Sequence, residues 1–389
     1  MFKPGLETFF ESDFKSCPLK VAAVTNNTGR DRNGIHLIQR LLNDKRFILK
    51  KIFTPEHGFL SDAPDGEYVS NSIEKSSGAE IISLYNESKI PSDNVLKEID
   101  LIIYDIQDVG VRFYTYISTL RNIIDSASKN GIAVAILDRP ELLGGINVEG
   151  PMLNQNLTSF VGHLPIALRY GLTAGELALF WRNQTKIETE VRVYKCQNYS
   201  CPMSIRATKF PWFKPSPSMT DIETAKFYPG TCLFEGTNLS EGRGTLSPFR
   251  NLGAPWVDNI KWYEILRTLL PSNITISKVE FIPTFSKYSG ILCKGIQLST
   301  NDDFLDNSVY IGVSALYALI QSHPNKIEFT TNPRLENPFI DYLSGTSELR
   351  MGLQNNLTPS QIISSFGVQT DKFRELRKSF FLYERSNTK

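Results

Sequence analysis

The chain has 389 residues, of which 41% are hydrophobic and 21% are charged, so it can bury a large core and we expect two globular domains. Its 42 lysines and arginines nearly balance its 41 aspartates and glutamates, which leaves a formal net charge of +1. This balance excludes recruitment to nucleic acid or to anionic lipid through an overall electrostatic field. Any partner must therefore be recognised at a local site.

Neither end of the chain nor any apolar run predicts contact with a membrane. The longest apolar runs, such as 101–104 and 132–137, are far shorter than a bilayer span. The N-terminus MFKPGLETFFESDFKSC lacks the basic and apolar regions of a secretory signal. This predicts a cytoplasmic location for the chain as given, or a periplasmic or secreted location if a signal has been removed.

The first third of the chain alternates between strand-like and helix-like segments. Buried strands are predicted at 20–25, 47–54, 80–85, 100–105 and 132–138, and helices at 34–42 and 114–129. Such alternation predicts an α/β fold with a Rossmann-like, mostly parallel sheet covered on both faces.

The chain changes character after the proline-rich stretch 209–218. Strands are predicted around 274–282 and 290–298, and helices near 309–321, 359–366 and 372–381. We place the domain boundary near Lys226, which gives a Rossmann-like domain at 1–226 and a smaller α+β domain at 227–389.

Polar residues follow four of the predicted strands, at the edge where open α/β sheets bind their ligands. They are Asn26 after the first strand, Glu56 and His57 after the second, Gln107 and Asp108 after the fourth, and Arg139 after the last. Four such segments at one edge predict a binding site there.

Several kinds of site are excluded by missing motifs. The sequence has no G-x-G-x-x-G after a strand, no phosphate-binding P-loop and no G-x-S-x-G nucleophile motif. It has four histidines without an H-E-x-x-H pair, and no C-x-x-C pair among Cys17, Cys196, Cys201, Cys232 and Cys293. We therefore expect no nucleotide cofactor and no metal, and cysteines that are reduced and structural.

The carboxylates that remain at this edge suit glycoside hydrolysis, which uses a carboxylic acid to protonate the leaving oxygen and often a second carboxylate. Glu56 suits the acid, because Pro55 restrains the chain before it and a tight turn follows. A turn glutamate that binds local backbone amides is the alternative. Asp105 and Asp108 could equally cap the helix that follows them.

The segment CLFEGTNLSEGRGTLSPF, at 232–249, reads as neither helix nor strand. A solvated loop is the simplest interpretation, because glycine, serine, threonine and asparagine cluster where the backbone turns. The apolar residues at both ends, however, indicate a loop whose ends are held in the core. A polar loop held in this way is a candidate for a functional site.

A set of motifs resembles one known family over the chain from about Gly5 to the C-terminus. The motifs are TPEHGF (54–59), DIQDVGVRFYTYISTL (105–120), LDRP (137–140), VEGP (148–151), SFVGHLPIALRYGLTAGELA (159–178), PSPSM (215–219), YPGTCLFEGTNLSEGRGTLSPF (228–249) and GAPW (253–256). Together they resemble the exo-β-N-acetylmuramidases of the NamZ family. The chain departs from the usual family pattern at Glu141, Ser218 and Thr220.

The resemblance implies an enzyme that removes N-acetylmuramic acid (MurNAc) from the non-reducing ends of peptidoglycan fragments such as MurNAc-GlcNAc. It also implies a cleft between a Rossmann-like catalytic domain and a smaller C-terminal domain. Glu56 takes the place of the family's catalytic glutamate, while Asp105, Glu235 and Glu241 are candidates for the second catalytic group. The expected partners are peptidoglycan-derived oligosaccharides, with no nucleic acid and no integral membrane contact; a non-catalytic carbohydrate-binding protein is the alternative.

Further residues are expected to contact the sugar if the resemblance holds. The loop at 232–249 would supply Asn238 and Arg243 in addition to its two glutamates. Muramic acid carries a lactyl carboxylate that an arginine could bind in a bidentate manner, and the candidates are Arg112, Arg139 and Arg243. Each arginine could instead pair with a neighbouring aspartate. Phe113, Tyr114 and Tyr116 could form a platform for the sugar or belong to the core.

Overall fold

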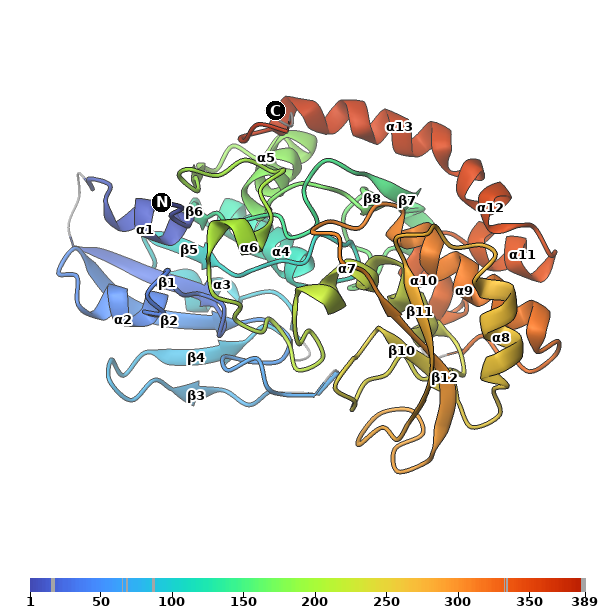
Figure 1. Ribbon diagram of the computed structural model, residues 1–389. Helices are drawn as coiled ribbons and strands as arrows, with labels where there is room; N and C mark the ends of the chain where they lie inside the picture. The colour runs from blue at the N-terminus through green and yellow to red at the C-terminus, as the bar shows by residue number, and fades with distance from the viewer. Residues whose placement is uncertain are drawn as a thin grey trace.

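The structure is a computed structural model that describes residues 1–14, 18–64, 66–67, 69–85, 88–331, 333 and 335–385. Its N-terminal part is built on a seven-stranded sheet of order β3-β4-β2-β1-β5-β6-β9 (Figure 1). All neighbours pair in parallel except β3 and β4, so the predicted α/β fold is confirmed. The strands are β1 (Leu19–Thr25), β2 (Phe47–Thr54), β3 (Ser72–Ile73), β4 (Glu80–Ser83), β5 (Leu101–Asp105), β6 (Ala133–Leu137) and β9 (Val191–Tyr194).

Both faces of this sheet are buried, as the apolar runs in the sequence predicted. Alternate residues of the central strands point to opposite sides, so Val21 and Ala23 of β1 pack with α1 (Gly5–Phe10) and α2 (Leu37–Leu42). Ala22 and Val24 of the same strand pack with α4 (Tyr116–Lys129) and α5 (Ala174–Thr185). The core therefore lies in two layers on either side of the sheet.

The predicted strands and helices of this part are confirmed with small shifts at their ends. The helix predicted from residue 34 begins only at Leu37, because the His36 imidazole caps it by accepting a hydrogen bond from Ile38 N. The helix predicted from residue 114 begins at Tyr116. Strands β3 and β9 were not predicted, and neither were α3 (Asp93–Leu96), α5 and α6 (Ile205–Thr208).

The C-terminal part packs helices against a three-stranded antiparallel sheet of order β10-β12-β11 (Figure 1). Its strands are β10 (Asn251–Ala254), β11 (Thr275–Phe281) and β12 (Cys293–Ser299). The helices are α7 (Ile222–Thr231), α8 (Asn259–Leu266), α9 (Ser308–Ser322), α10 (Phe339–Ser344), α11 (Glu348–Gln354), α12 (Pro359–Ser365) and α13 (Gly367–Leu376). The two predicted strands and the helices at α9, α12 and α13 are confirmed, although α13 begins five residues before the predicted start at 372.

The last residues of the chain return to the N-terminal part, where α13 lies beside α5 (Figure 1). The Tyr383 hydroxyl donates a hydrogen bond to Asp138 at 2.7 Å, just beyond the end of β6. The Leu382 amide donates to Glu176 of α5, also at 2.7 Å. The C-terminal end of the chain thus packs on the N-terminal part. An additional antiparallel hairpin is formed by β7 (Glu149–Met152) and β8 (Ala167–Arg169).

No helix in the described ranges is long and apolar enough to cross a membrane. Cys196, Cys201, Cys232 and Cys293 are buried and form no disulfide, and Cys17 lies outside the described residues.

Helix α7 crosses the sequence position of the proposed domain boundary and packs closely on α9. A Cβ atom added to Gly312 of α9 would lie 2.2 Å from the carbonyl oxygen of Gly230 in α7. A Cβ atom added to Gly230 would lie 2.1 Å from the carbonyl oxygen of Ser308. Only glycine allows the two backbones to approach so closely, and α7 leads directly into the 3-10 turn η2 (Cys232–Gly236).

We predict that Gly312→Ala lowers the free energy of unfolding by about 1–3 kcal/mol, because the new methyl group meets backbone that cannot move independently. The matched control is Gly367→Ala at the start of α13, where an added Cβ meets no atom within 4 Å. That variant should be neutral or up to about 1 kcal/mol more stable. Urea unfolding of both variants measures the difference, and equal stabilities would contradict the close contact of α7 and α9.

Candidate active site

Glu56 lies two residues beyond the end of β2, in a turn whose backbone is tied on both sides. The amide of Gly58 donates to the carbonyl oxygen of Pro55 at 3.1 Å, and the His57 ring Nδ1 lies 2.8 Å from the carbonyl oxygen of Ala63. His57 has a φ of 69°, in the left-handed region that non-glycine residues seldom occupy. The turn therefore holds Glu56 in one direction.

The Glu56 carboxylate accepts one hydrogen bond on each oxygen. The Thr115 hydroxyl donates to Oε2 at 2.6 Å, and the amide of Gly66 donates to Oε1 at 3.2 Å. Thr115 is the N-cap residue of α4, yet its side chain caps no helix amide. Its hydroxyl donates to Glu56 instead, so the start of α4 lacks the stabilisation that an N-cap side chain usually gives.

Glu56 is 9% exposed and opens into a cavity of about 270 Å³. Both halves of the chain line this cavity, so it lies in a cleft between them. Its lining residues are Glu56, His57, Gly66, Tyr85, Phe113, Tyr114, Thr115, Val161, Ser216, Met219, Tyr228, Cys232, Glu235, Arg243, Phe249, Phe339 and Leu343. A wall with six phenylalanines and tyrosines, two carboxylates and one guanidinium suits a sugar ring, which offers apolar C–H faces and polar hydroxyls.

The loop at 232–249 forms one side of the cavity and is not a free solvated loop. It begins with the 3-10 turn η2, and its Ser240 pairs with Gly253 of β10. Arg243 binds the Glu235 carboxylate at 2.6 Å and lies 3.3 Å from the Glu241 carboxylate. Its guanidinium also lies 4.8 Å from the centre of the Phe249 ring.

Lys287 binds the same loop through several hydrogen bonds. Its ammonium donates to the carbonyl oxygens of Phe234, Glu235 and Leu239 at 2.9–3.2 Å and to the Glu241 carboxylate at 3.2 Å. Glu241 is 2% exposed and is thus compensated by two cations.

A second cavity of about 550 Å³ adjoins the first and shares Glu235, Arg243 and Phe339 with it. It is lined in addition by Asp62, Pro64, Glu67, Pro217, Glu241, Phe285, Ser286 and Lys287. The two cavities are thus adjacent, and we call the Glu56 cavity the inner one and its neighbour the outer one.

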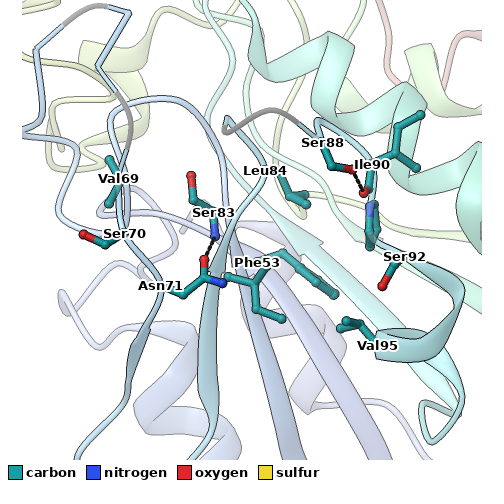
Figure 2. Close-up of a pocket in the computed structure, with 12 residues that line it drawn as sticks. Phe53, Val69, Ser70, Asn71, Ser83, Leu84, Ser88, Ile90, Ser92 and Val95 are labelled. Atoms are coloured by element: carbon teal, nitrogen blue, oxygen red, sulfur yellow. Dashed lines mark hydrogen bonds between the residues drawn. The ribbon is translucent and has the colours of Figure 1, made fainter.

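A larger cavity of about 600 Å³ lies beyond the ends of β2 and β4, where Figure 2 shows Phe53, Leu84 and Val95 between the segments at 69–71 and 88–92. Asn71 there accepts a hydrogen bond from the Ser83 amide at 3.1 Å. Its described lining contains serines, one asparagine and apolar residues, but no Asp, Glu, His, Lys or Arg. Acid–base chemistry therefore belongs to the smaller cavity with Glu56.

Comparison with known proteins agrees with this geometry. Residues 21–223 match the family model described as exo-β-N-acetylmuramidase NamZ, N-terminal, and residues 226–383 match the model of its C-terminal part. The chain belongs to the NamZ family.

Individual relatives cover nearly the whole chain. The peptidoglycan β-N-acetylmuramidase NamZ of Bacillus subtilis (strain 168) is 36% identical over 364 residues, which are 94% of this chain and 87% of that protein. The crystal structure of one DUF1343 family protein of Bacteroides fragilis NCTC 9343 matches with a TM-score of 0.87 at 27% identity, covering 98% of this chain and 99% of the other. A second DUF1343 family protein of that strain matches with a TM-score of 0.76 at 29% identity, covering 99% of both chains.

The structure brings together six of the residues predicted for the site. Glu56, His57, Tyr114, Glu235 and Arg243 line the inner cavity, and Glu241 lines the outer one. Of the other two predicted platform residues, Phe113 lines the cavity, whereas Tyr116 is fully buried and donates its hydroxyl to the carbonyl oxygen of Pro215.

The edge beyond β1, β5 and β6 is not open, and this corrects the prediction of a site there. Asp105 is fully buried and forms an ion pair with Arg139 at 2.6 Å. Burial raises the pKa of Asp105, and the charge of Arg139 partly opposes that rise. The aromatic segment at 210–213 covers this edge. The space that remains, about 10 Å³, has room for one water molecule at most.

The remaining predicted residues bind other parts of the chain and do not line the two cavities. Asn26 accepts hydrogen bonds from Thr28, Gln107 donates to the Pro140 carbonyl oxygen, and Asp108 accepts from Tyr170 and Gly110. Arg112 donates to the carbonyl oxygens of Pro151, Ile166, Leu343 and Ser344. The Asn238 side chain donates to the Lys326 carbonyl oxygen and accepts from the Glu328 amide. Burial raises the pKa of Asp108 to about 6. We do not retain these residues, Asp105 or Arg139 in the proposed site.

Sequence reasoning missed Thr115 and Lys287. Thr115 lies within the quoted motif at 105–120, but only the approach of α4 to the turn after β2 gives its hydroxyl a role. Lys287 lies outside all quoted motifs and has no sequence signal. Within the described ranges, no group of three or more His, Cys, Asp or Glu side chains is arranged to hold a metal ion.

We predict that Thr115→Val lowers kcat on MurNAc-GlcNAc about tenfold, because Glu56 loses its shorter hydrogen bond and with it a fixed direction. The matched control is Thr119→Val, one turn further along α4, where the hydroxyl contacts only the Thr115 carbonyl oxygen at 3.4 Å. That variant should keep near wild-type kcat. Equal losses in the two variants would show that packing of α4, and not the bond to Glu56, sets the rate.

Proposed function

We propose that this NamZ family glycosidase releases single MurNAc units from the non-reducing ends of peptidoglycan fragments such as MurNAc-GlcNAc, with Glu56 as the general acid. The observation that carries the proposal is the placement of Glu56. Its carboxyl group is fixed by two hydrogen bonds at the inner end of a site formed by both halves of the chain. The Bacillus subtilis relative is a peptidoglycan β-N-acetylmuramidase, which agrees with this substrate class.

The hydrogen bonds of Glu56 suit a group that must gain and lose a proton. Both donors, the Thr115 hydroxyl and the Gly66 amide, are neutral, and in the described part of the chain Glu56 makes no ion pair. Protonation of Glu56 therefore breaks no salt bridge. A protonated Glu56 can donate its proton to the glycosidic oxygen as the bond to the leaving sugar breaks.

Glu235 is our proposal for the second catalytic group. It lines the same inner cavity from the opposite half of the chain, and Arg243 holds its carboxylate at 2.6 Å. An ionised carboxylate there can stabilise the oxocarbenium-like centre or activate water. Glu241 suits this role less well, because Arg243 and Lys287 both bind it and it lines only the outer cavity.

The arrangement of the two cavities supports an exo mode of action. We place the terminal MurNAc in the inner cavity of about 270 Å³ and the sugar on the leaving side in the outer cavity of about 550 Å³. An inner cavity of this size favours one sugar ring over a longer chain end. A substrate would therefore enter with its non-reducing end first.

Incubation with MurNAc-GlcNAc and with longer glycan fragments, followed by mass spectrometry of the products over time, tests the proposed function. We expect free MurNAc as the first product from every substrate, with the remaining fragment shortened by one sugar. Early products of mixed length would show an endo mode and overturn the proposal.

We predict that Glu56→Gln folds normally, binds substrate and loses about 100- to 10,000-fold in turnover of MurNAc-GlcNAc, because glutamine cannot supply the proton. A nitrophenyl MurNAc glycoside should lose much less, since nitrophenolate leaves without protonation. The matched control is Glu80→Gln in β4, where the carboxylate is 44% exposed and pairs with Lys51. Equal losses on both substrates would show that Glu56 is not the acid.

A further inference from the structure

Lys89 is a cation beside the inner cavity that has no carboxylate partner in the described part of the chain. Its ammonium lies 3.9 Å from the centre of the Tyr85 ring and 4.2 Å from the centre of the Phe160 ring. The two ring centres are 5.8 Å apart. The rings attract the positive charge through their electron-rich faces and leave its hydrogen-bond donors available to a ligand.

The position of Lys89 relative to the inner cavity follows from its neighbours. Tyr85 lines that cavity, and so does Val161, which follows Phe160. Ser88 and Ile90, on either side of Lys89, line the larger apolar cavity and are drawn there in Figure 2. The segment that carries Lys89 therefore separates the two cavities.

The backbone of Lys89 is anchored, which keeps its side chain at this boundary. The Asn122 side-chain amide of α4 donates to the Lys89 carbonyl oxygen at 3.0 Å. Burial lowers the pKa of the Lys89 ammonium, and the negative charge of Glu56 opposes that change. The Glu56 carboxylate is thus close enough for its charge to act on the Lys89 ammonium.

The arginines expected to bind the lactyl carboxylate are committed elsewhere. Arg139 pairs with buried Asp105, Arg112 donates to backbone carbonyl oxygens, and Arg243 binds Glu235 and Glu241. A substrate carboxylate would have to displace a protein carboxylate or carbonyl from any of them. Lys89 requires no such displacement.

We propose that Lys89 binds the lactyl carboxylate of the terminal MurNAc and so determines the preference of the site for muramic acid over glucosamine. This inference rests on the proposed function. A partly desolvated ammonium that has no counter-ion among the described residues gains a charge-assisted hydrogen bond when the carboxylate arrives. A sugar without that carboxylate leaves the ammonium as it is and gains nothing from it.

The test compares two ligands that differ only in this charge: MurNAc and its lactyl methylamide. Dissociation constants are measured by calorimetry for the wild type, Lys89→Met and Lys89→Arg. We expect Lys89→Met to weaken binding of MurNAc about 10- to 150-fold, the range for a hydrogen bond to a charged group. Binding of the methylamide should change less than about twofold, and Lys89→Arg should keep most of the preference.

Turnover provides a second measurement. On a nitrophenyl MurNAc glycoside, Lys89→Met should raise KM by a similar factor and leave kcat close to that of the wild type, because the carboxylate is bound equally in the ground and transition states. The matched control is Lys97→Met at the C-terminal end of α3, where an exposed lysine is removed. It should change neither KM nor kcat.

The outcomes separate this inference from the proposed function. Equal weakening of both ligands by Lys89→Met, or an unchanged preference for MurNAc, overturns the role of Lys89 while the wild type still releases MurNAc. A fall in kcat without a change in KM would also overturn it, because it would indicate an effect on Glu56. A wild type that neither binds MurNAc nor cleaves MurNAc-GlcNAc overturns the proposed function itself.

Discussion

The binding of one ammonium group to a turn of backbone holds the active site together. Lys287 donates to three carbonyl oxygens between residues 234 and 239 and to the Glu241 carboxylate. The loop at 232–249 has little regular structure of its own, so its carbonyl groups would otherwise need water or would remain unpaired. With Lys287 in place, Glu235 and Arg243 acquire fixed positions at the cavity wall.

The other wall of the cavity has an independent support. The turn after β2 is tied by its own backbone and by His57, and α4 contributes the Thr115 hydroxyl. Helix α7 connects these two supports, because its Tyr228 packs edge-on against Phe113 and Tyr114, just before α4, and the helix continues into η2. The geometry of the cavity thus depends on how tightly two separately built walls are held together, and the packing of Tyr228 against Phe113 and Tyr114 joins them.

The sequence predicted the sheet well, because alternate burial of short apolar runs depends on local pattern alone. It also predicted the tight turn that holds Glu56, because neighbouring residues specify this turn; the catalytic role of Glu56 stays a prediction. It could not distinguish Arg139 and Arg112 from ligand-binding arginines, since their partners come from distant segments: Asp105 for the first, and carbonyl groups near 151, 166 and 344 for the second. The cover over Asp105 at 210–213 was equally invisible, because a chain segment that folds over a strand end has no local signature.

The carboxylates and cations around the cavity differ in how far their charges are compensated, and the roles that we propose for them follow from this difference. Glu241 is almost fully buried and two cations bind it, so its charge is compensated within the loop. Glu235 has Arg243 and faces the cavity, which suits a carboxylate that stays ionised during the reaction. Glu56 has only neutral donors, so it can carry a proton without the loss of an ion pair. In the described part of the chain, Lys89 completes this series as a cation held by aromatic rings alone, which leaves its charge for the substrate.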